Sequence, residues 1–191
     1  MILKKICIYA SSSNNIPAEY ARCCQSIAEL LARRDMELIY GGGDIGIMGK
    51  VAQIFLNHNR PVTGVIPEKL NIPGVVHRGL TQLIIVPDMR KRKELMENLA
   101  DGFIAFPGGI GTMEELLEIM TLKQLGYHSK PIILYNCLDY YTPLVRMLEK
   151  TVQLGFMKSE FMDFISISSD DHQIIDYLET YQAPSSIRKW V

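Results

Sequence analysis

The sequence predicts an α/β fold built on a doubly wound parallel sheet of about seven strands, with helices on both faces. Short, nearly all-apolar runs alternate along the whole chain with longer stretches whose apolar residues recur at helical spacing. Runs such as 103–106 carry apolar side chains at successive positions, which fits strands covered on both faces of a parallel sheet. The alternation also predicts right-handed crossover connections between neighbouring strands.

The size of the chain fits one domain. Its 191 residues match the usual length of a single domain, which we place at 1–183, followed by a tail at 184–191 without a clear pattern. The hydrophobic content of 48% allows a full core, and a net charge of −1 gives no reason to expect nucleic acid. Apolar runs stay below the ~18 residues that span a bilayer, so we expect no membrane association.

The cysteines and histidines indicate a cytoplasmic protein without a metal site. Cys7, Cys23, Cys24 and Cys137 form no CxxC pattern, which favours reduced thiols. The four histidines are scattered and lack metal-ligand spacing, so we expect neither a metal nor another cofactor. The opening, MILKKICIYA, has too short an apolar part for a signal peptide and is typical of a first strand.

The first strand, predicted at 6–10, ends in three serines. Ser11, Ser12 and Ser13 separate it from a helix that opens near Pro17 and runs to about 34, with an apolar stripe at helical spacing. Two interpretations of the serines remain open at this point. They are turn residues, or they are hydroxyl donors to a ligand.

The second strand, at 36–40, is followed by the glycine-dense stretch GGGDIGIMGKVA. Gly41, Gly43 and Gly46 match the GxGxxG dinucleotide fingerprint, although that fingerprint usually follows the first strand. The glycines indicate either a tight turn with close helix packing or a backbone that a ligand approaches.

A helix to about 57 leads to a third strand at 62–66 and then to Glu68, either a surface carboxylate or a ligand group. After a loop at 71–80 and a strand at 83–86, Asp88 is placed to cap the next helix. Arg92 and Lys93 fall on the same helix face as Met89. Cations in a first turn oppose the helix dipole, so this broken local rule predicts an anion near the helix start.

The stretch FIAFPGGIGTMEELLEIM, at 103–120, is the centre of the predicted site. Pro107 ends a buried strand, and Gly108, Gly109 and Gly111 leave main-chain N–H groups bare at a helix N-terminus, which suits an anion. Thr112 is placed to cap that helix, and Thr112 with Glu115 fits a capping box. Alternatively, the carboxylates of Glu114 and Glu115 interact with a hydroxyl, a water or a developing cation.

The rest of the chain continues the alternation. The helix runs to about 126, and a strand follows at 131–135, a helix at 140–154 and a short strand at 165–167. Asp170 or Asp171 caps a final helix to about 181. All the unusual groups follow predicted strands at their carboxyl ends, where doubly wound sheets bind ligands. Glycine turns, an arginine and carboxylates in one place predict a nucleotide or a sugar phosphate.

Three motifs resemble those of the Lonely Guy (LOG) family, the cytokinin riboside 5′-monophosphate phosphoribohydrolases, which are often labelled lysine decarboxylases. They are GGGxxGxMG at 41–49, the segment Met89-x-x-Arg92-Lys93, and PGGxGTxxE at 107–115. The resemblance spans about 6–178. It implies a Rossmann-like nucleotide-binding domain and a homodimer. It also implies hydrolysis of the N-glycosidic bond of (N6-modified) adenosine 5′-monophosphate to free base and ribose 5-phosphate.

The resemblance implies that Arg92 and Glu115 are the catalytic pair. We expect Glu115 to activate water or to stabilise an oxocarbenium-like sugar, and Arg92 to stabilise charge on the leaving base or the phosphate. From the resemblance, together with the shared location of the motifs, we expect the substrate to contact Ser12, Gly42, Gly43, Met48, Gly49, Glu68, Met89, Lys93, Gly108, Gly109, Gly111, Thr112, Glu114 and Thr121. The chain departs from the usual family residues at Ala10 and Arg90, which bears on base preference.

Other functions fit parts of the same pattern. The Gly41-x-Gly43-x-x-Gly46 spacing fits an NAD(P)-dependent oxidoreductase. A non-catalytic nucleotide-binding or molybdenum-cofactor-binding protein would use the same turns without turnover, and the paired Arg92 and Glu115 argue against it. The lysine decarboxylase label finds no support, because no lysine has a recognisable pyridoxal-phosphate context.

Overall fold

The computed structural model, which describes residues 3–183, confirms the predicted parallel sheet. Seven strands lie in the order β4-β3-β2-β1-β5-β6-β7, and each neighbouring pair is parallel. The tail predicted at 184–191 lies outside the described residues. The strands are β1 (Lys5–Tyr9), β2 (Glu37–Tyr40), β3 (Val62–Pro67), β4 (Gln82–Val86), β5 (Gly102–Ala105), β6 (Ile132–Tyr135) and β7 (Ser166–Ser168).

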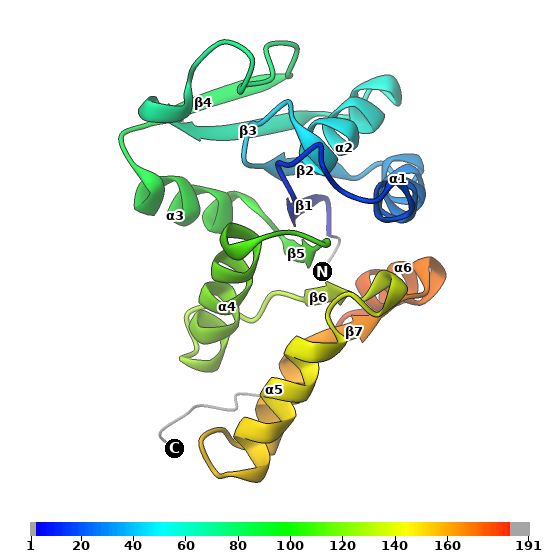
Figure 1. Cartoon of the computed structure of the whole chain (residues 1–191), viewed down its shortest axis with the longest axis vertical. Coiled ribbons are helices and arrows are strands. Elements are labelled where there is room, and N and C mark those ends of the chain that lie inside the picture. The colour runs from blue at the N-terminus through cyan, green and yellow to red at the C-terminus, as the bar shows by residue number, and fades with distance from the viewer. Residues whose placement is uncertain (1–2, 184–191) are drawn as a thin grey trace.

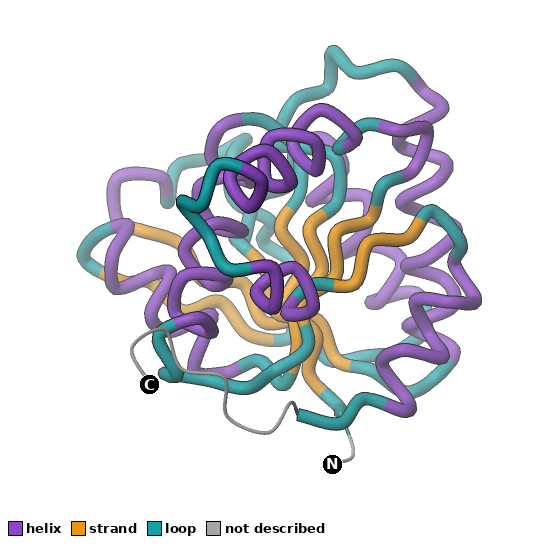
Figure 2. The backbone as a smooth tube through the Cα atoms, turned by 90° about the horizontal axis from the view of Figure 1, so that it is seen from below, coloured by secondary structure: helices purple, strands orange, loops and turns teal. Residues whose placement is uncertain are grey.

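Helices cover both faces of this sheet, and Figure 2 shows the strands fanning out between them. One core layer joins α1, α2 and α6 to the sheet, and the other joins α3, α4 and α5 to its opposite face (Figure 1). The helices are α1 (Ala18–Arg33), α2 (Gly46–Asn57), α3 (Met89–Leu99), α4 (Ile110–Gln124), α5 (Thr142–Gln153) and α6 (Asp171–Thr180); short 3₁₀ turns are η1 (Glu68–Leu70), η2 (Cys137–Asp139) and η3 (Ser159–Phe164). Across 3–183, none of these helices has the length and apolar character needed to cross a membrane.

The order of the strands places a topological switch between β1 and β5. From β1 the chain winds through β2 and β3 to β4 at one edge, and α3 then carries it back to β5 on the other side of β1. Tyr9 of β1 is in register with Ala105 of β5, so the turns that follow these strands are neighbours. Ser11 N–H donates to the Pro107 carbonyl at 3.2 Å, which ties the two turns together.

The predicted helix caps were partly wrong. Asp88 caps α3 by accepting the N–H groups of Arg90 and Lys91, and Asp170 caps α6. The predicted cap at Thr112 is incorrect, because α4 begins at Ile110 and Thr112 lies inside its first turn. The cause is Gly109, whose extended backbone (φ −82°, ψ −158°) already serves as the residue before the helix. Thr112 and Glu115 therefore form no capping box.

Candidate active site

A cavity of about 500 Å³ opens at the carboxyl ends of the central strands. Its walls come from residues 10–13 after β1, from Gly41 and Gly43 after β2, and from residues 109–112 at the start of α4. Arg92 and Glu115 also line it. The cavity thus lies at the switch point, where a doubly wound sheet is expected to hold a ligand.

Arg92 of α3 and Glu115 of α4 form a buried ion pair in this cavity. Arg92 Nη1 lies 2.9 Å from Glu115 Oε1, and Arg92 Nε donates to the Val65 carbonyl at 3.1 Å. The two residues are only 8% and 7% exposed. The contact of Arg92 Nε with the main chain helps to hold the guanidinium in this geometry beside Glu115.

Gly41 creates the space in which the guanidinium lies. A Cβ atom at position 41 would stand 1.9 Å from Arg92 Nη2. The Nη2 end of the Arg92 guanidinium therefore lies against the bare backbone after β2, and any side chain at position 41 would displace it. This contact gives Gly41 a role within the protein itself, separate from any contact with a ligand.

The pKa of Glu115 is raised above its ordinary value of 4.5. Burial is the largest cause, and the nearby Arg92 guanidinium offsets part of it. Because a general base works best when its pKa is near the operating pH, the shift makes Glu115 a stronger base than an exposed carboxylate. The pair therefore combines a strengthened base with a fixed positive charge.

The loop after β1 is fixed between the two glycine turns. Met48 N–H donates to the Ser11 carbonyl at 3.2 Å, and Gly46 N–H donates to Asn14 Oδ1 at 3.0 Å. Gly46 has a left-handed φ of +72°, and a Cβ there would lie 2.6 Å from the Ser11 carbonyl oxygen. Asn14 was missed by the sequence analysis; its only signal was an asparagine beside the predicted serine turn.

The N-terminus of α4 is the best anion site in the cavity. Gly109, Ile110, Gly111 and Thr112 line the wall here, and within the described chain no side chain caps this helix. The first N–H groups of an uncapped helix and its dipole both favour a negatively charged group. The predicted contacts at Gly109, Gly111 and Thr112 are thus brought together with Ser12, Gly43 and Met48 in one cavity.

Apolar side chains form another part of the cavity wall. Ile45, Ile66, Leu70 and Val75 line it, and the sequence analysis named none of them. The segment after η1 folds over the glycine turn because Asp44 N–H donates to the Val75 carbonyl at 2.8 Å. Such a wall suits the flat, apolar face of a base.

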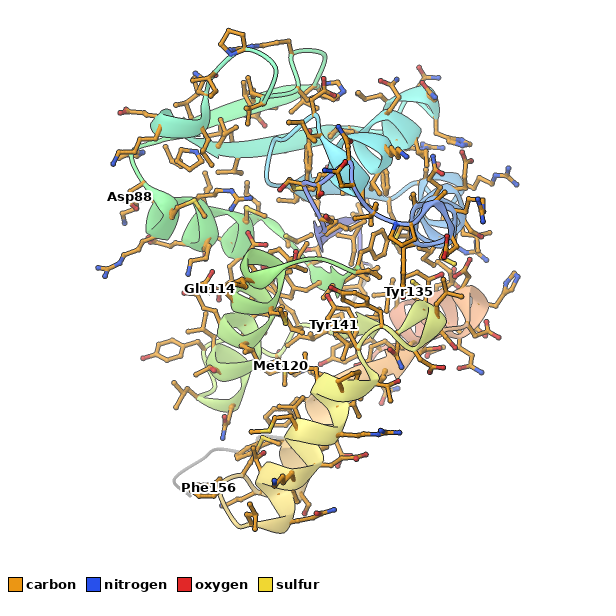
Figure 3. All side chains as sticks on the ribbon, viewed as in Figure 1. Asp88, Glu114, Met120, Tyr135, Tyr141 and Phe156 are labelled. Atoms are coloured by element: carbon orange, nitrogen blue, oxygen red, sulfur yellow. The ribbon has the colours of Figure 1, made fainter. Side chains whose placement is uncertain are left out.

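Several predicted contact residues lie outside the cavity lining. Lys93 pairs with Glu114 and, at 2.9 Å, with Glu118, and Figure 3 shows Glu114 projecting from α4 toward α3. Glu68 is exposed on η1, and the Thr121 hydroxyl donates to the Leu117 carbonyl at 2.7 Å.

Three predicted glycine contacts and one methionine are also absent from the cavity lining. Gly42 takes a left-handed φ of +74°. A Cβ at Gly49 would stand 2.2 Å from the Asp44 carbonyl, and one at Gly108 would stand 2.1 Å from Thr112 Oγ1. Met89 is 43% exposed, and its sulfur lies 4.0 Å from Arg92 Nη1. The three glycines therefore meet needs of the protein itself: a left-handed backbone at Gly42 and close packing at Gly49 and Gly108.

Comparison with known proteins assigns the chain to a family. Residues 48–178 match the family described as "Possible lysine decarboxylase". An Arabidopsis thaliana cytokinin riboside 5′-monophosphate phosphoribohydrolase is 36% identical over 178 residues, which cover 93% of this chain and 84% of the relative. The chain belongs to the Lonely Guy (LOG) family. A LOG relative from Rhodococcoides fascians, also named a cytokinin riboside 5′-monophosphate phosphoribohydrolase, is 39% identical over 81% of this chain and 78% of its own.

Solved structures show that the LOG fold extends to distant proteins. The molybdenum cofactor binding protein of Rippkaea orientalis superposes with a TM-score of 0.70 at 18% identity, covering 94% of this chain and 98% of that one. The molybdenum cofactor carrier protein of Chlamydomonas reinhardtii gives 0.68 at 15% identity, covering 93% and 96%. At these identities the likeness supports the shared Rossmann-like fold alone.

Proposed function

We propose that this LOG-family protein hydrolyses the N-glycosidic bond of (N6-modified) adenosine 5′-monophosphates to free base and ribose 5-phosphate, a cytokinin-activating reaction. The observation that carries the proposal is the buried Arg92–Glu115 pair in a cavity that also holds the uncapped N-terminus of α4. The relatives named as phosphoribohydrolases support the same reaction.

The site supplies one group for each part of a nucleotide. The 5′-phosphate binds the N–H groups at the start of α4, where Gly109 and Gly111 leave the backbone open. The base lies against the apolar wall that includes Leu70 and Val75, and an N6 substituent extends along that wall. The ribose is then held between the two, beside Glu115.

Cleavage of the bond between the sugar and the base develops positive charge on the ribose. The Glu115 carboxylate stabilises that charge and activates the water that attacks the anomeric carbon. Arg92 holds the carboxylate in place at 2.9 Å and stabilises negative charge on the departing base or the phosphate. The water adds its hydroxyl to the sugar, and the proton leaves with the base.

We infer that the protein acts as a homodimer through the surface of α4 and the end of α5. An apolar groove of about 290 Å³ lies here, between Met120 of α4 and Phe156 after α5 (Figure 3). Phe156 is 83% exposed and Leu117 is 41% exposed, a pattern that favours coverage by a partner. Phe156→Asp is expected to halve the mass measured by sedimentation, and an unchanged mass would contradict this interface.

We also propose a cytoplasmic location, which the cysteines support. All four cysteines are free, and three of them are buried. Free thiols persist in a reducing compartment, which supports a cytoplasmic location.

The proposed reaction is tested with a panel of substrates. Adenosine, N6-isopentenyladenosine, guanosine and cytidine 5′-monophosphates are each scored for free base and ribose 5-phosphate, beside the unphosphorylated nucleosides. We expect release from the adenine nucleotides and little from the nucleosides, because these lack the group that binds α4. Glu115→Gln and Arg92→Ala should each abolish release while the protein stays folded. Full activity in either variant would remove that residue from the mechanism.

A further inference from the structure

Two adjacent tyrosines at the start of α5 hold the glycine turn that precedes α4. The Tyr140 hydroxyl donates to the Gly108 carbonyl at 2.7 Å, and the Tyr141 hydroxyl donates to the Phe106 carbonyl at the same distance. Neither tyrosine lines the cavity, and neither was singled out by its sequence pattern. Figure 3 shows Tyr141 in the space between α4 and α5.

A strained turn directs these tyrosines toward the glycine turn. Leu138 (φ 51°, ψ 33°) and Asp139 (φ 58°) both take left-handed backbone conformations, which side chains other than glycine rarely adopt. Asn136 holds the turn, because its Oδ1 accepts the N–H of Tyr141 at 2.6 Å. Strain of this kind persists where the surrounding contacts fix the backbone, and it is concentrated at functional sites.

The Gly108–Gly109 peptide connects Tyr140 to the anion site. In a trans peptide the C=O and the following N–H point in opposite directions. Because the Gly108 carbonyl faces Tyr140, the N–H of Gly109 faces away from it, and Gly109 lines the cavity. A peptide between two glycines flips readily, since neither residue has a Cβ to restrict it. The Tyr140 hydroxyl is therefore the contact that opposes such a flip.

We propose that Tyr140 is a positioning residue that locks the Gly108–Gly109 peptide so that the Gly109 N–H donates to the substrate's 5′-phosphate. This inference rests on the proposed function, which places the phosphate at the start of α4. Tyr141 provides an internal comparison. The Tyr141 hydroxyl donates to the carbonyl of Phe106, and the next residue, Pro107, has no N–H. Fixing that peptide therefore orients no N–H donor toward the ligand.

The test compares Tyr140→Phe with Tyr141→Phe, each of which removes one hydroxyl. Tyr140 is 37% exposed, so its phenylalanine variant is expected to fold. Calorimetry gives the Kd of ribose 5-phosphate and of free adenine, and thermal unfolding gives Tm. We expect Tyr140→Phe to raise the Kd of ribose 5-phosphate about tenfold or more, the usual effect of losing a hydrogen bond to a charged group. The Kd of adenine should not change. Tyr141→Phe should lower Tm. Its Kd for ribose 5-phosphate should stay within about threefold of the wild-type value, a change too small for the loss of a hydrogen bond to the phosphate.

Three results would overturn the proposal: unchanged ribose 5-phosphate affinity in Tyr140→Phe, an equal loss in Tyr141→Phe, or a parallel loss of adenine affinity. The first result would show that the Tyr140 hydroxyl does not orient the Gly109 N–H. The other two would show that the substitution distorts the whole site. Turnover is measured separately on the wild-type protein. Binding of ribose 5-phosphate without base release from any nucleotide would contradict the proposed function, while the Kd comparison would still decide the role of Tyr140.

Discussion

Replacing Gly41 by alanine tests whether the position of the Arg92 guanidinium controls activity. The new Cβ would lie 1.9 Å from Arg92 Nη2, and ordinary contact begins at 3.4 Å, so the guanidinium must move by about 1.5 Å (3.4 − 1.9). Gly41 lies outside the left-handed region, so alanine adds no backbone strain. A shift of this size breaks the 2.9 Å contact with Glu115 or the 3.1 Å contact with Val65.

The expected loss is mainly in catalysis. Misplacement of a catalytic group by about 1 Å can cost about 10²-fold in rate, so we expect kcat/KM for base release to fall by about that factor. Stability should fall by only about 1–3 kcal/mol, the usual cost of leaving a buried polar group without its partner. Base release gives kcat/KM, and urea unfolding gives the free energy of unfolding.

Gly43→Ala is the matched control for this substitution. Gly43 also lines the cavity, but a Cβ there would meet Met48 Cε at 3.0 Å, the end of a flexible side chain that can move aside. We expect its kcat/KM to fall by less than about tenfold, because it leaves the aligned pair intact. Equal kcat/KM in Gly41→Ala and wild type, or equal losses in the two alanine variants, would refute the role assigned to Gly41.

Three further predictions concern ionisation. Because burial raises the pKa of Glu115 and the carboxylate is the active form, kcat/KM should fall as pH drops through a midpoint above 4.5; a midpoint at or below 4.5 would contradict this. Gly41→Ala should raise that midpoint further, because it displaces the guanidinium that lowers the pKa. Burial lowers the pKa of Lys123 from 10.5 to about 8, so the unfolded chain binds that proton more tightly between these values. Lys123 therefore contributes stability that increases with pH across this window, so urea titrations should show the free energy of unfolding of the wild type rising relative to that of Lys123→Met.

Much of the fold was predictable because its signals are local and repeated. Each buried strand is a short apolar run, and the α1 stripe of Cys24, Ile27 and Leu31 is buried at the spacing that predicted it. Arg92 was predictable for a different reason: a cation on an apolar helix face breaks a local rule, and its partner is 23 residues away in the chain.

Other parts of the site depend on contacts that the sequence does not encode locally. The capping-box interpretation of Thr112 and Glu115 failed because α4 starts at Ile110 after the extended Gly109, and the spacing of the two residues does not show where the helix begins. The glycines at 42 and 49 have the sequence pattern of ligand contacts. In the structure, the atoms that a Cβ at either position would meet belong to the protein. The apolar wall at Leu70 depends on how a loop folds back over a turn from another strand.

A double-mutant cycle on base release tests whether Arg92 and Glu115 act as one unit on the bond between ribose and base. Rates are measured for the wild type, Arg92→Ala, Glu115→Gln and the double variant on adenosine and N6-isopentenyladenosine 5′-monophosphates. We expect each single variant to lose nearly as much activity as the double variant, because residues that act as a unit have strongly non-additive effects. Independent losses that multiply in the double variant would contradict this expectation.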